Sequence, residues 1–451
     1  MPVFVHEFFC SGAFEGDLAD RSLAREGLAM LAAVVEDFSN AGDGQVVTTL
    51  DRRLRASPAA ARIGEQSAVI WVDSPAEERR LFADLARAST ATLVIAPETG
   101  GCLLERRLLT DAAGGRFLGP SPEAIELCAD KLRLSEHLSR HSIPTIPTTR
   151  FDLSVGSAEC QFPMVVKPRD GAGSVDTFLI LDSGEFQELA TRFRGGRPLT
   201  PSPSPARGEG GGFECAASIF NWLQREHSSP LSPHCVGAGS FRRSGGRRQD
   251  GRGAGGEGLS GPGCKVAHNQ SEAILQPFIP GRALSTAALI DAGDGRIDIF
   301  PLGEQRLTND GRFGYRGGRI PAVDLSPVLA AAAVDLVADA CRSLPGLAGY
   351  IGVDLIASAD RPHVRIVEVN PRLTTSYVGY RRLTQENLAA RMLSSFVGWD
   401  KLAKRAPAHQ FAGNNFEDQD GGPAPGGPAL SHPTKSLQSV DFDADGTVRV
   451  V

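Results

Sequence analysis

Several features that mark particular protein classes are missing from this sequence of 451 residues. The eight cysteines form no CxxC pair and are too sparse for a disulfide scaffold, so we expect reduced thiols, no structural zinc and no catalytic cysteine. No apolar run is long enough to span a bilayer, and the N-terminal residues lack a basic segment followed by a long apolar stretch. These absences favour a soluble, cytoplasmic protein without a membrane partner.

An excess of positive charge is also missing. The formal net charge is -6, and no basic stripe interleaved with aromatic residues occurs where the chain is expected to fold, so nucleic acid is not an expected partner. The phosphate-binding pattern GxxxxGK[ST] is absent, and no GxGxxG follows an expected strand in the first 120 residues. A nucleotide site in this chain must therefore be of another type.

Apolar residues make up 41% of the chain, which is enough for two or three domains. Strands and helices are expected to alternate through the first 120 residues. The expected strands are 2–9, 46–50, 67–72 and 91–96, and the expected helices are 22–37 and 75–87. This alternation predicts a doubly wound parallel sheet, so the N-terminal region is assigned to the α/β class.

A hairpin is predicted where two β-branched apolar runs, 350–356 and 364–369, flank a polar turn. Asp354 lies within the first run, and Glu368 and Asn370 lie at the end of the second. Because Glu368 and Asn370 are two residues apart on a strand, their side chains point to the same face of the sheet. Three oxygen ligands on adjacent strands suit a hard cation such as Mg²⁺. The alternative is a solvated hairpin with ordinary surface acids, although burying such groups without a partner is costly.

A phosphate site is predicted around Lys167, which ends the expected buried strand 162–168. A buried lysine needs an anionic partner. The glycine-rich run that follows would let backbone amides close around phosphate oxygens. The candidate residues of this run are Asp170, Gly171, Gly173 and Ser174.

The hairpin, with GVDLI followed by VEVNPR, resembles the metal-binding hairpin of ATP-grasp carboxylate-amine ligases. The resemblance implies that ATP is the nucleotide and that Asp354, Glu368 and Asn370 bind Mg²⁺, with Mn²⁺ as the alternative ion. It covers most of residues 1–400, including the segments VHEFFCSGA, SLAREGLAML, IAPETGG and VNPRLTTSY. The expected fold is α/β, with an α+β clamp: an ATP-grasp fold preceded by the doubly wound domain.

The resemblance also implies nucleotide contacts. Lys131, within a helix expected at 122–141, matches the family's first nucleotide-binding lysine, although a single helix lysine is most often only solvated. The segment LQPFIPG resembles the strand and hinge that hold the adenine. Its candidate residues are Gln276, Phe278 and Ile279.

The hinge departs from the family pattern. Many relatives carry acids where this chain has Pro277 and Ala283, so the usual contact with the ribose is in question. Glu304 is the nearest substitute. Ala96–Gly101 follows an expected strand and is a candidate for the acceptor substrate site, or else a plain glycine turn.

Arginines surround Gly317 and Gly318 between two expected strands. A Gly-Gly pair with flanking arginines predicts a mobile loop over the site, and an exposed basic turn is the alternative. Arg372 is expected on the metal-binding face of the hairpin. Its guanidinium could form two hydrogen bonds with a carboxylate or a phosphate. Arg306 and Arg372 are the catalytic candidates, and Arg316 and Arg319 would help to offset the charge of ATP and a carboxylate.

Residues from about 196 to 270 are low in complexity, apart from a short apolar patch at 213–223. We expect a disordered insertion there, with RNA binding as the less favoured alternative. Helices are expected at 325–344, packed on the hairpin, and at 385–397, with a last strand pair at about 440–451.

Four regions follow from these assignments. They are an α/β domain at 1–120, a nucleotide clamp at 121–290 interrupted by the insertion, a C-terminal ATP-grasp domain at 291–400, and a Gly/Pro-rich tail at 401–451.

The resemblance implies an ADP-forming reaction. A carboxylate, such as that of an amino acid like glutamate, would attack the γ-phosphate to give an acyl phosphate, and an amine would then displace phosphate. The expected partners are these small molecules, and a homodimer remains open. The alternatives are another ATP-grasp amino-acid or dipeptide ligase, and an inactive nucleotide-binding protein.

Overall fold

The computed structural model describes residues 1–16, 22–42, 45–151, 161–194, 273–358, 363–397, 429–430 and 439–450. The insertion expected at about 196–270 lies outside these ranges, as do the turn of the hairpin and most of the tail. None of the helices in the described ranges combines the length and apolar character that a membrane span requires. Cys10, Cys102, Cys128 and Cys341 are buried, and the other four cysteines fall outside the described ranges.

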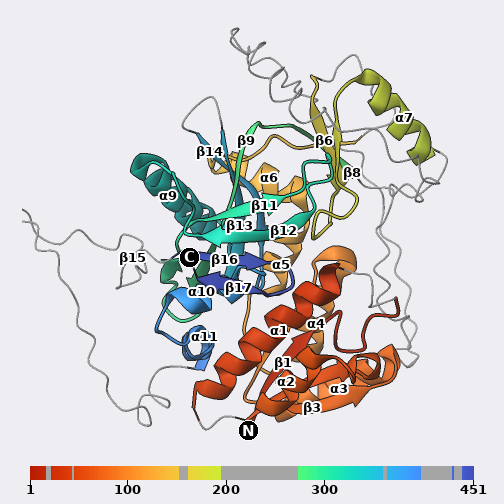
Figure 1. The fold of residues 1–451 in the computed structure, drawn as a ribbon, viewed down its shortest axis with the longest axis vertical. Coiled ribbons are helices and arrows are strands. Elements are labelled where there is room, and N and C mark those ends of the chain that lie inside the picture. Colours follow the sequence, from red (N-terminus) through yellow and green to blue (C-terminus); the bar gives the residue numbers. More distant parts are fainter. Residues whose placement is uncertain are drawn as a thin grey trace, which may run out of the picture. The chain divides into compact units, whose positions relative to one another are not determined.

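The N-terminal domain contains a parallel sheet in the order β3-β2-β1-β4. Its strands are β1 (Val3–Glu7), β2 (Val46–Asp51), β3 (Ala68–Val72) and β4 (Ala91–Ile95). Its helices are α1 (Ser22–Asn40), α2 (Pro58–Gln66), α3 (Pro75–Ala88) and α4 (Cys102–Ala112), with short 3-10 turns at Arg52–Leu54 and Thr99–Gly101 (Figure 1). The predicted alternation is therefore confirmed, although the sequence reading missed α2 and α4.

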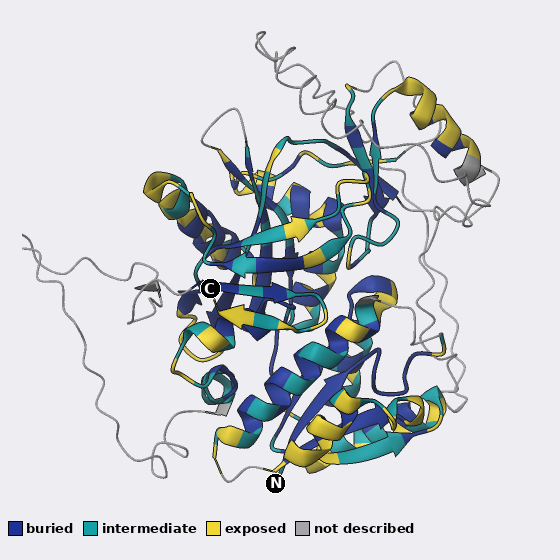
Figure 2. Cartoon of the chain, in the orientation of Figure 1, coloured by how far each residue is buried: buried dark blue, intermediate teal, exposed yellow. Residues whose placement is uncertain are grey.

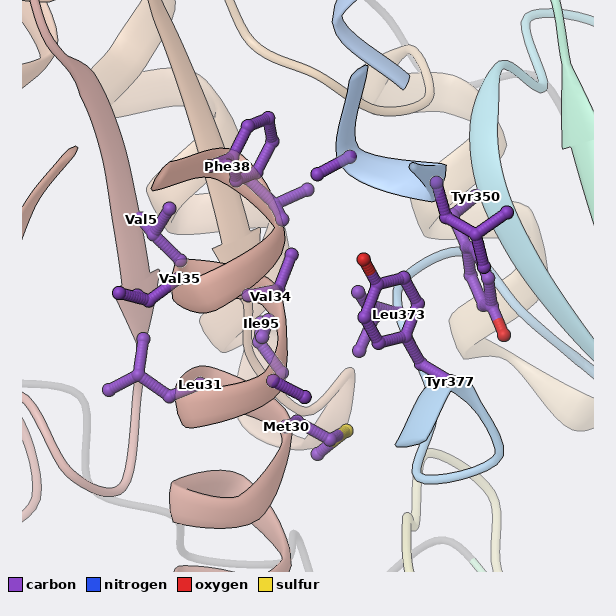
Figure 3. Close-up of a cluster of buried hydrophobic side chains, with 14 of the residues drawn as sticks. Val5, Met30, Leu31, Val34, Val35, Phe38, Ile95, Tyr350, Leu373 and Tyr377 are labelled. Atoms are coloured by element: carbon purple, nitrogen blue, oxygen red, sulfur yellow. The ribbon is translucent and has the colours of Figure 1, made fainter. Parts of the chain in front are cut away.

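Helix α1 is buried on two sides because its sequence carries two apolar faces. Leu31 and Val35 point toward Val5 of β1, whereas Met30 and Val34 point the other way, toward a region that contains Leu373 and Tyr377 (Figure 3). One hydrophobic core thus joins the N-terminal sheet to the C-terminal part of the chain. Asp37 of α1 reinforces this contact, since it accepts a hydrogen bond of 2.6 Å from the Tyr377 hydroxyl and pairs with Arg381.

The large sheet has the order β14-β13-β9-β11-β12-β16-β17, and β10 pairs with β9 and β15. Its strands are β9 (Gly281–Ile290), β10 (Ile297–Ile299), β11 (Gly303–Leu307), β12 (Tyr315–Ile320), β13 (Gly349–Ser358), β14 (Val364–Asn370), β15 (Ala429–Leu430), β16 (Val440–Asp443) and β17 (Val448–Val450). The helices around it are α5 (Pro122–Ala129), α9 (Pro327–Ser343), α10 (Tyr377–Leu383) and α11 (Leu388–Val397). Strands β9 and β13 are buried along most of their length (Figure 2).

Strand β13 directs alternate side chains to opposite faces of the large sheet. Ile351 and Val353 pack in the cluster that contains α9, as expected for the helix predicted at 325–344. Tyr350 packs in the cluster that contains α1. Asp354 shares the parity of Tyr350, so it faces away from α9.

A third, smaller antiparallel sheet, which we call the lid sheet, has the order β5-β8-β6-β7. It consists of β5 (Thr149–Arg150), β6 (Met164–Pro168), β7 (Phe178–Ile180) and β8 (Ala273–Pro277), and α7 (Ser183–Arg194) packs on it (Figure 1). Helix α6 (Lys131–Arg140) precedes the lid sheet in the chain.

The helix expected at 122–141 is two helices. Asp130 separates α5 from α6 because its backbone is extended and its carboxylate accepts hydrogen bonds from the amides of Leu132 and Arg133 at 3.1 Å each. An aspartate in this capping role starts a new helix. Lys131 therefore lies at the first turn of α6 rather than within a longer helix.

The mobile loop expected around Gly317 and Gly318 is instead strand β12, which pairs with β11 and β16. A Cβ atom added at Gly317 would lie 2.1 Å from the carbonyl oxygen of Phe442, and one at Gly318 would lie 2.8 Å from its ring. Glycine is needed here because another strand passes very close, so the prediction of a loop was wrong.

The sheets do not follow two of the boundaries that the sequence suggested. Strand β9 joins the large sheet, so the change from lid sheet to large sheet falls between Pro277 and Gly281 rather than near residue 290. Strands β16 and β17 form, as expected, from the last residues, but they extend the large sheet and do not belong to a separate tail. Backbone pairing across many residues, which local sequence patterns do not reveal, sets both boundaries.

Candidate functional site

A cavity of about 290 Å³ is lined by residues from all three sheets. Twelve of the predicted site residues line it: Lys131, Lys167, Gly171, Gly173, Ser174, Gln276, Phe278, Ile279, Asp354, Glu368, Asn370 and Arg372. Asp170, Glu304 and Arg306 do not line it. The convergence of twelve candidates, which are spread over 242 positions from Lys131 to Arg372, makes this cavity the candidate site.

The hairpin brings its three polar residues together. Asp354 on β13 lies opposite Glu368 on β14, and the register shifts immediately after Asp354. The side-chain amides of Asn370 and Gln305 donate hydrogen bonds to the two oxygens of the Asp354 carboxylate, at 3.2 Å and 2.9 Å respectively. Gln305, from β11, was not among the predicted residues, because no motif marks it.

The two hairpin carboxylates have very different pKa values. Burial, and after it the negative charge of Glu368, holds the pKa of Asp354 well above its usual range. Burial alone would also raise the pKa of Glu368, but the charges of Lys131 and Lys167 outweigh it and hold this pKa at about 2. Two carboxylates this close need a cation between them or a proton on one of them.

A divalent cation fits this donor set only if phosphate oxygens complete its shell. No group of three or more His, Cys, Asp or Glu side chains that could hold a metal occurs in the described part of the chain. Asp354, Glu368 and the amide oxygen of Asn370 offer a few hard oxygen donors. Mg²⁺ is commonly bound by one or two carboxylates and by the phosphates of its substrate.

Two buried lysines lie next to these carboxylates. The Lys131 ammonium donates a hydrogen bond to the Gly171 carbonyl oxygen and lies 3.5 Å from Glu368 Oε2. Lys167, at the end of the buried strand β6, is 8% exposed. Burial lowers the pKa of Lys167 to about 8, although the charge of Glu368 opposes the shift. An anion such as a phosphate would stabilise its charged form.

The glycine-rich loop after β6 lies close to the N-terminal domain. Asp170 does not line the cavity, but its carboxylate accepts a hydrogen bond of 3.1 Å from the Gly100 amide. Gly173 has φ +65, and a Cβ atom there would lie 2.6 Å from a methyl carbon of Leu23. Gly173 thus combines a left-handed conformation with a close approach to α1, which only glycine accommodates without strain.

The hinge contributes an aromatic wall. Phe278 stacks on Phe313, with ring centroids 6.1 Å apart and an interplanar angle of 28°, and both rings line the cavity. The Phe278 amide donates a hydrogen bond of 3.0 Å to the Pro163 carbonyl oxygen. Gln276 is buried, and its amide donates to the Thr148 hydroxyl at 2.8 Å. Phe313 was missed by sequence reasoning because it lies outside every motif.

Arg372 forms a bidentate ion pair with Glu98. Its Nε and Nη2 atoms lie 3.0 Å and 3.1 Å from the two oxygens of Glu98, and both side chains are largely buried. Glu98 belongs to the Ala96–Gly101 segment predicted for the acceptor site. Ala96 and Pro97 line the cavity, and Thr99–Gly101 forms a 3-10 turn ahead of α4. Glu98 itself was not predicted.

The other arginines do not form a shell around the cavity. Arg306 donates to Asp443 and to the Phe442 carbonyl oxygen, both at 2.8 Å, and Arg319 donates to the Ser439 hydroxyl at 3.0 Å. Arg316 is exposed. The reason is that the C-terminal strand β16 lies against β12, so that Phe442 and Asp443 of this strand, and Ser439 just before it, supply these partners. The sequence had placed these residues in a separate tail.

Glu304, the nearest substitute for the ribose-binding acid, pairs with Arg282. Two hydrogen bonds, of 3.2 Å and 2.8 Å, join their side chains outside the cavity. The structure therefore does not place Glu304 where it could reach a nucleotide in the cavity.

Two further acids line the cavity at its N-terminal side. Glu7 ends β1 and is 2% exposed, and Glu26 lies on α1. Burial raises the pKa of Glu7 to about 7. Neither acid was predicted, although their place at the end of a strand and on the apolar helix beside it was visible in the sequence.

Two family models match the sequence. The model of the ATP-grasp domain matches residues 248–376, and that of the pre ATP-grasp 3 domain matches residues 44–125. The first range contains the hinge and the hairpin, while the second contains most of the N-terminal sheet.

Two curated relatives share part of the sequence. The tyramine–L-glutamate ligase of Methanocaldococcus fervens is 30% identical over 122 residues, which are 27% of this chain and 37% of the relative. The enzyme of the same name from Methanocaldococcus jannaschii is 31% identical over 122 residues, 35% of its length. The chain thus matches little more than a third of each relative.

Solved structures resemble the chain over most of its length. An ATP-grasp superfamily protein from Archaeoglobus fulgidus has a TM-score of 0.52 at 19% identity and covers 87% of this chain and 88% of its own. The biotin carboxylase domain of the Hydrogenobacter thermophilus 2-oxoglutarate carboxylase, solved with MgADP and bicarbonate, has a TM-score of 0.57 at 15% identity, covering 88% and 69% respectively. At these identities the likeness shows the fold. The chain therefore has an ATP-grasp fold with an N-terminal α/β domain, and it resembles the ATP-grasp carboxylate-amine ligases.

Proposed function

We propose that this chain is an ATP-dependent, ADP-forming ligase that joins a carboxylate to an amine through an acyl phosphate. One observation carries the proposal. Lys131 and Lys167 lie beside the paired carboxylates Asp354 and Glu368 in a cavity that Arg372 also lines. Positioning and neutralising charge are nearly all that phosphoryl transfer requires of a protein.

The nucleotide would lie with its phosphates near the lysines. Gly171, Gly173 and Ser174 line the cavity, and their amides would contact phosphate oxygens, while the rings of Phe278 and Phe313 would pack on the adenine. The ribose contact has no assigned acid, since Glu304 is engaged by Arg282.

Asp354, Glu368 and Asn370 would hold Mg²⁺, with Mn²⁺ as the alternative. When bound, the ion would supply positive charge to the phosphate oxygens. Within the protein, Lys131 would keep Glu368 ionised and the amides of Asn370 and Gln305 would orient Asp354.

Arg372 would bind the substrate carboxylate or the phosphoryl group. It is the one predicted arginine that lines the cavity. Its Nε and Nη2 atoms are bound to Glu98, so a substrate anion would displace Glu98 or bind at Nη1. Arg306 keeps no part in this proposal, because β16 supplies its partners.

The substrates follow from resemblance alone. The curated relatives are named for joining tyramine to L-glutamate, so we propose an amino acid such as glutamate as the carboxylate and tyramine or a similar amine as the acceptor. A role in cofactor biosynthesis, a cytoplasmic location and a homodimer belong to the same proposal.

Release of ADP and phosphate from ATP tests the function. The purified chain would be incubated with ATP, Mg²⁺ and a matrix of amino acids and amines that includes glutamate and tyramine, and products would be identified by mass spectrometry. We expect ADP release only when both a carboxylate and an amine are present.

The outcomes separate the alternatives. Turnover with glutamate and tyramine supports the substrates named above, and turnover with another pair supports a different amino-acid or dipeptide ligase. Binding of ATP without turnover for any pair would refute the ligase and support an inactive nucleotide-binding protein.

A further inference from the structure

The cavity extends beyond the phosphate end into the N-terminal domain, where its walls change in character. Phe9, Leu23 and Met30 line this part together with Ile95 and Ala96, and all five side chains are apolar. Among the described residues of the N-terminal domain, Glu7 and Glu26 are the charged groups in the lining. The N-terminal part of the described lining thus carries two acids and no cation, whereas Lys131, Lys167 and Arg372 line the cavity together with the hairpin carboxylates.

Glu7 is buried without a cationic partner. Its side chain is 2% exposed, and its Oε2 atom accepts a hydrogen bond of 2.8 Å from the Cys10 amide. No Lys, Arg or His side chain in the described ranges forms an ion pair with Glu7. A buried carboxylate without a counter-ion is costly, and it remains where a ligand or a function requires it. Burial raises the pKa of Glu7 to about 7, although the hydrogen bond from Cys10 and the charge of Arg372 oppose the shift.

Helix α1 is adapted to hold this carboxylate. Leu23, Glu26 and Met30 follow helical spacing, so one face of α1 lines the cavity. Gly27 lies beside them, and a Cβ atom added there would lie 2.4 Å from the Glu7 Oε1 atom. Glycine weakens a helix interior, so its presence here is explained by the space that the Glu7 carboxylate occupies. Glu26 lies next to this contact, and it accepts a hydrogen bond of 3.2 Å from the Thr375 hydroxyl.

We propose that Glu7, with Glu26 beside it, binds the ammonium group of the amine substrate, and that Phe9, Leu23 and Met30 hold its apolar or aromatic body. This inference rests on the proposed ligase function and deepens it. A carboxylate substrate is repelled from this end by the two acids, so it is directed to Arg372. Charge therefore sorts the two substrates within one cavity.

Calorimetric titration with three phenyl compounds tests the assignment. Phenethylamine carries an ammonium group, 2-phenylethanol is its neutral analogue, and 3-phenylpropionate carries a carboxylate. We expect the full chain to bind phenethylamine at least about tenfold more tightly than 2-phenylethanol, because a hydrogen-bonded charge contributes that much. The affinity for 3-phenylpropionate, which is directed to Arg372, should not fall in Glu7→Gln. Equal affinity for the amine and the alcohol would overturn the proposal.

Variants locate the site. Glu7→Gln should weaken phenethylamine binding by about tenfold, and Glu26→Gln by a smaller factor. Glu65→Gln, an exposed acid on α2, is the matched control and should leave the affinity unchanged. Gly27→Ala keeps both acids, but its added methyl group displaces the Glu7 carboxylate, so it should also weaken phenethylamine binding. It serves as the second variant if Glu7→Gln does not fold. Unchanged amine binding in Glu7→Gln, or in Gly27→Ala and Glu26→Gln together, refutes the assignment.

A separate titration with ADP and Mg²⁺ distinguishes failure of this inference from failure of the proposed function. A parent protein that binds the nucleotide but does not discriminate amine from alcohol refutes the amine site alone. A parent that does not bind the nucleotide refutes the ligase function, whatever the amine data show.

Discussion

The ammonium group of Lys167 is buried, and burial disfavours its charged form. Replacing it with alanine should therefore weaken ATP binding by about tenfold or more, since the partner of a phosphate is lost. The measurement is calorimetric titration with ATP and Mg²⁺. Arg133→Ala, an exposed cation on α6, is the control and should bind as the parent does. Nucleotide affinity unchanged in Lys167→Ala would exclude this lysine from the phosphate site.

Glu7 should make stability depend on pH. Its folded pKa is about 7, above the value of 4.5 for an exposed glutamate, so the folded state retains a proton that the unfolded state releases. The free energy of unfolding should therefore fall as pH rises from about 4.5 to 7, by up to about 3 kcal/mol from this residue.

Urea unfolding across that pH range measures the effect. Glu7→Gln cannot lose a proton, so the fall should be smaller in this variant than in the parent, while Glu65→Gln should follow the parent. Equal slopes in the parent and Glu7→Gln would show that burial does not perturb Glu7.

At the scale of single elements, β12 depends on two glycines that other residues cannot replace. Gly317 has φ +120, and its added Cβ would meet the Phe442 carbonyl oxygen, so Gly317→Ala should cost about 1–3 kcal/mol for the clash in addition to the backbone strain. Gly295 has φ +72 with nothing within 4 Å, so Gly295→Ala isolates the strain. Chemical unfolding compares the two. Equal losses of unfolding free energy in the two variants would mean that the Cβ atom added at Gly317 does not clash with β16.

Local sequence patterns were enough to predict those parts of the candidate site that lie within one strand, hairpin or loop. Asp354, Glu368 and Asn370 come together through strand alternation and one hairpin, both of which are local patterns. Lys167 and its glycine loop were found in the same way. Partners far apart in the chain could not be found: Arg372 meets Glu98 across 274 positions, and Arg306 meets Asp443 across 137. Their encounter is decided by packing of whole elements, for which a single sequence carries no local signal.

At the scale of the whole molecule, the four strands of the lid sheet pair without any contribution from the segment that links α7 to β8 in the chain. Strands β5, β6, β7 and β8 pair with one another, and α7 packs on them. Replacing residues 201–262 with a short Gly/Ser linker should therefore change the free energy of unfolding by no more than about 1–2 kcal/mol, because loop-closure entropy varies only with the logarithm of length.

ATP turnover and thermal melting of this deletion variant provide the measurement. We expect a folded protein with parental turnover and lower sensitivity to protease. A folded variant that binds ATP but has lost turnover would instead assign substrate contacts to residues 201–262.

The two-sided burial of α1 has a consequence for how substrates enter. Leu31 and Val35 contact the N-terminal sheet while Met30 and Val34 face the C-terminal part of the chain, so separating the two would expose a shared core (Figure 3). Such an opening would be as costly as partial unfolding. We therefore expect the lid sheet, which has a small core of its own, to move more easily than the N-terminal sheet, with a hinge between β8 and β9. Nucleotide and substrates would then enter by way of the lid sheet, while Glu7 and Glu26 would stay fixed relative to the hairpin of β13 and β14.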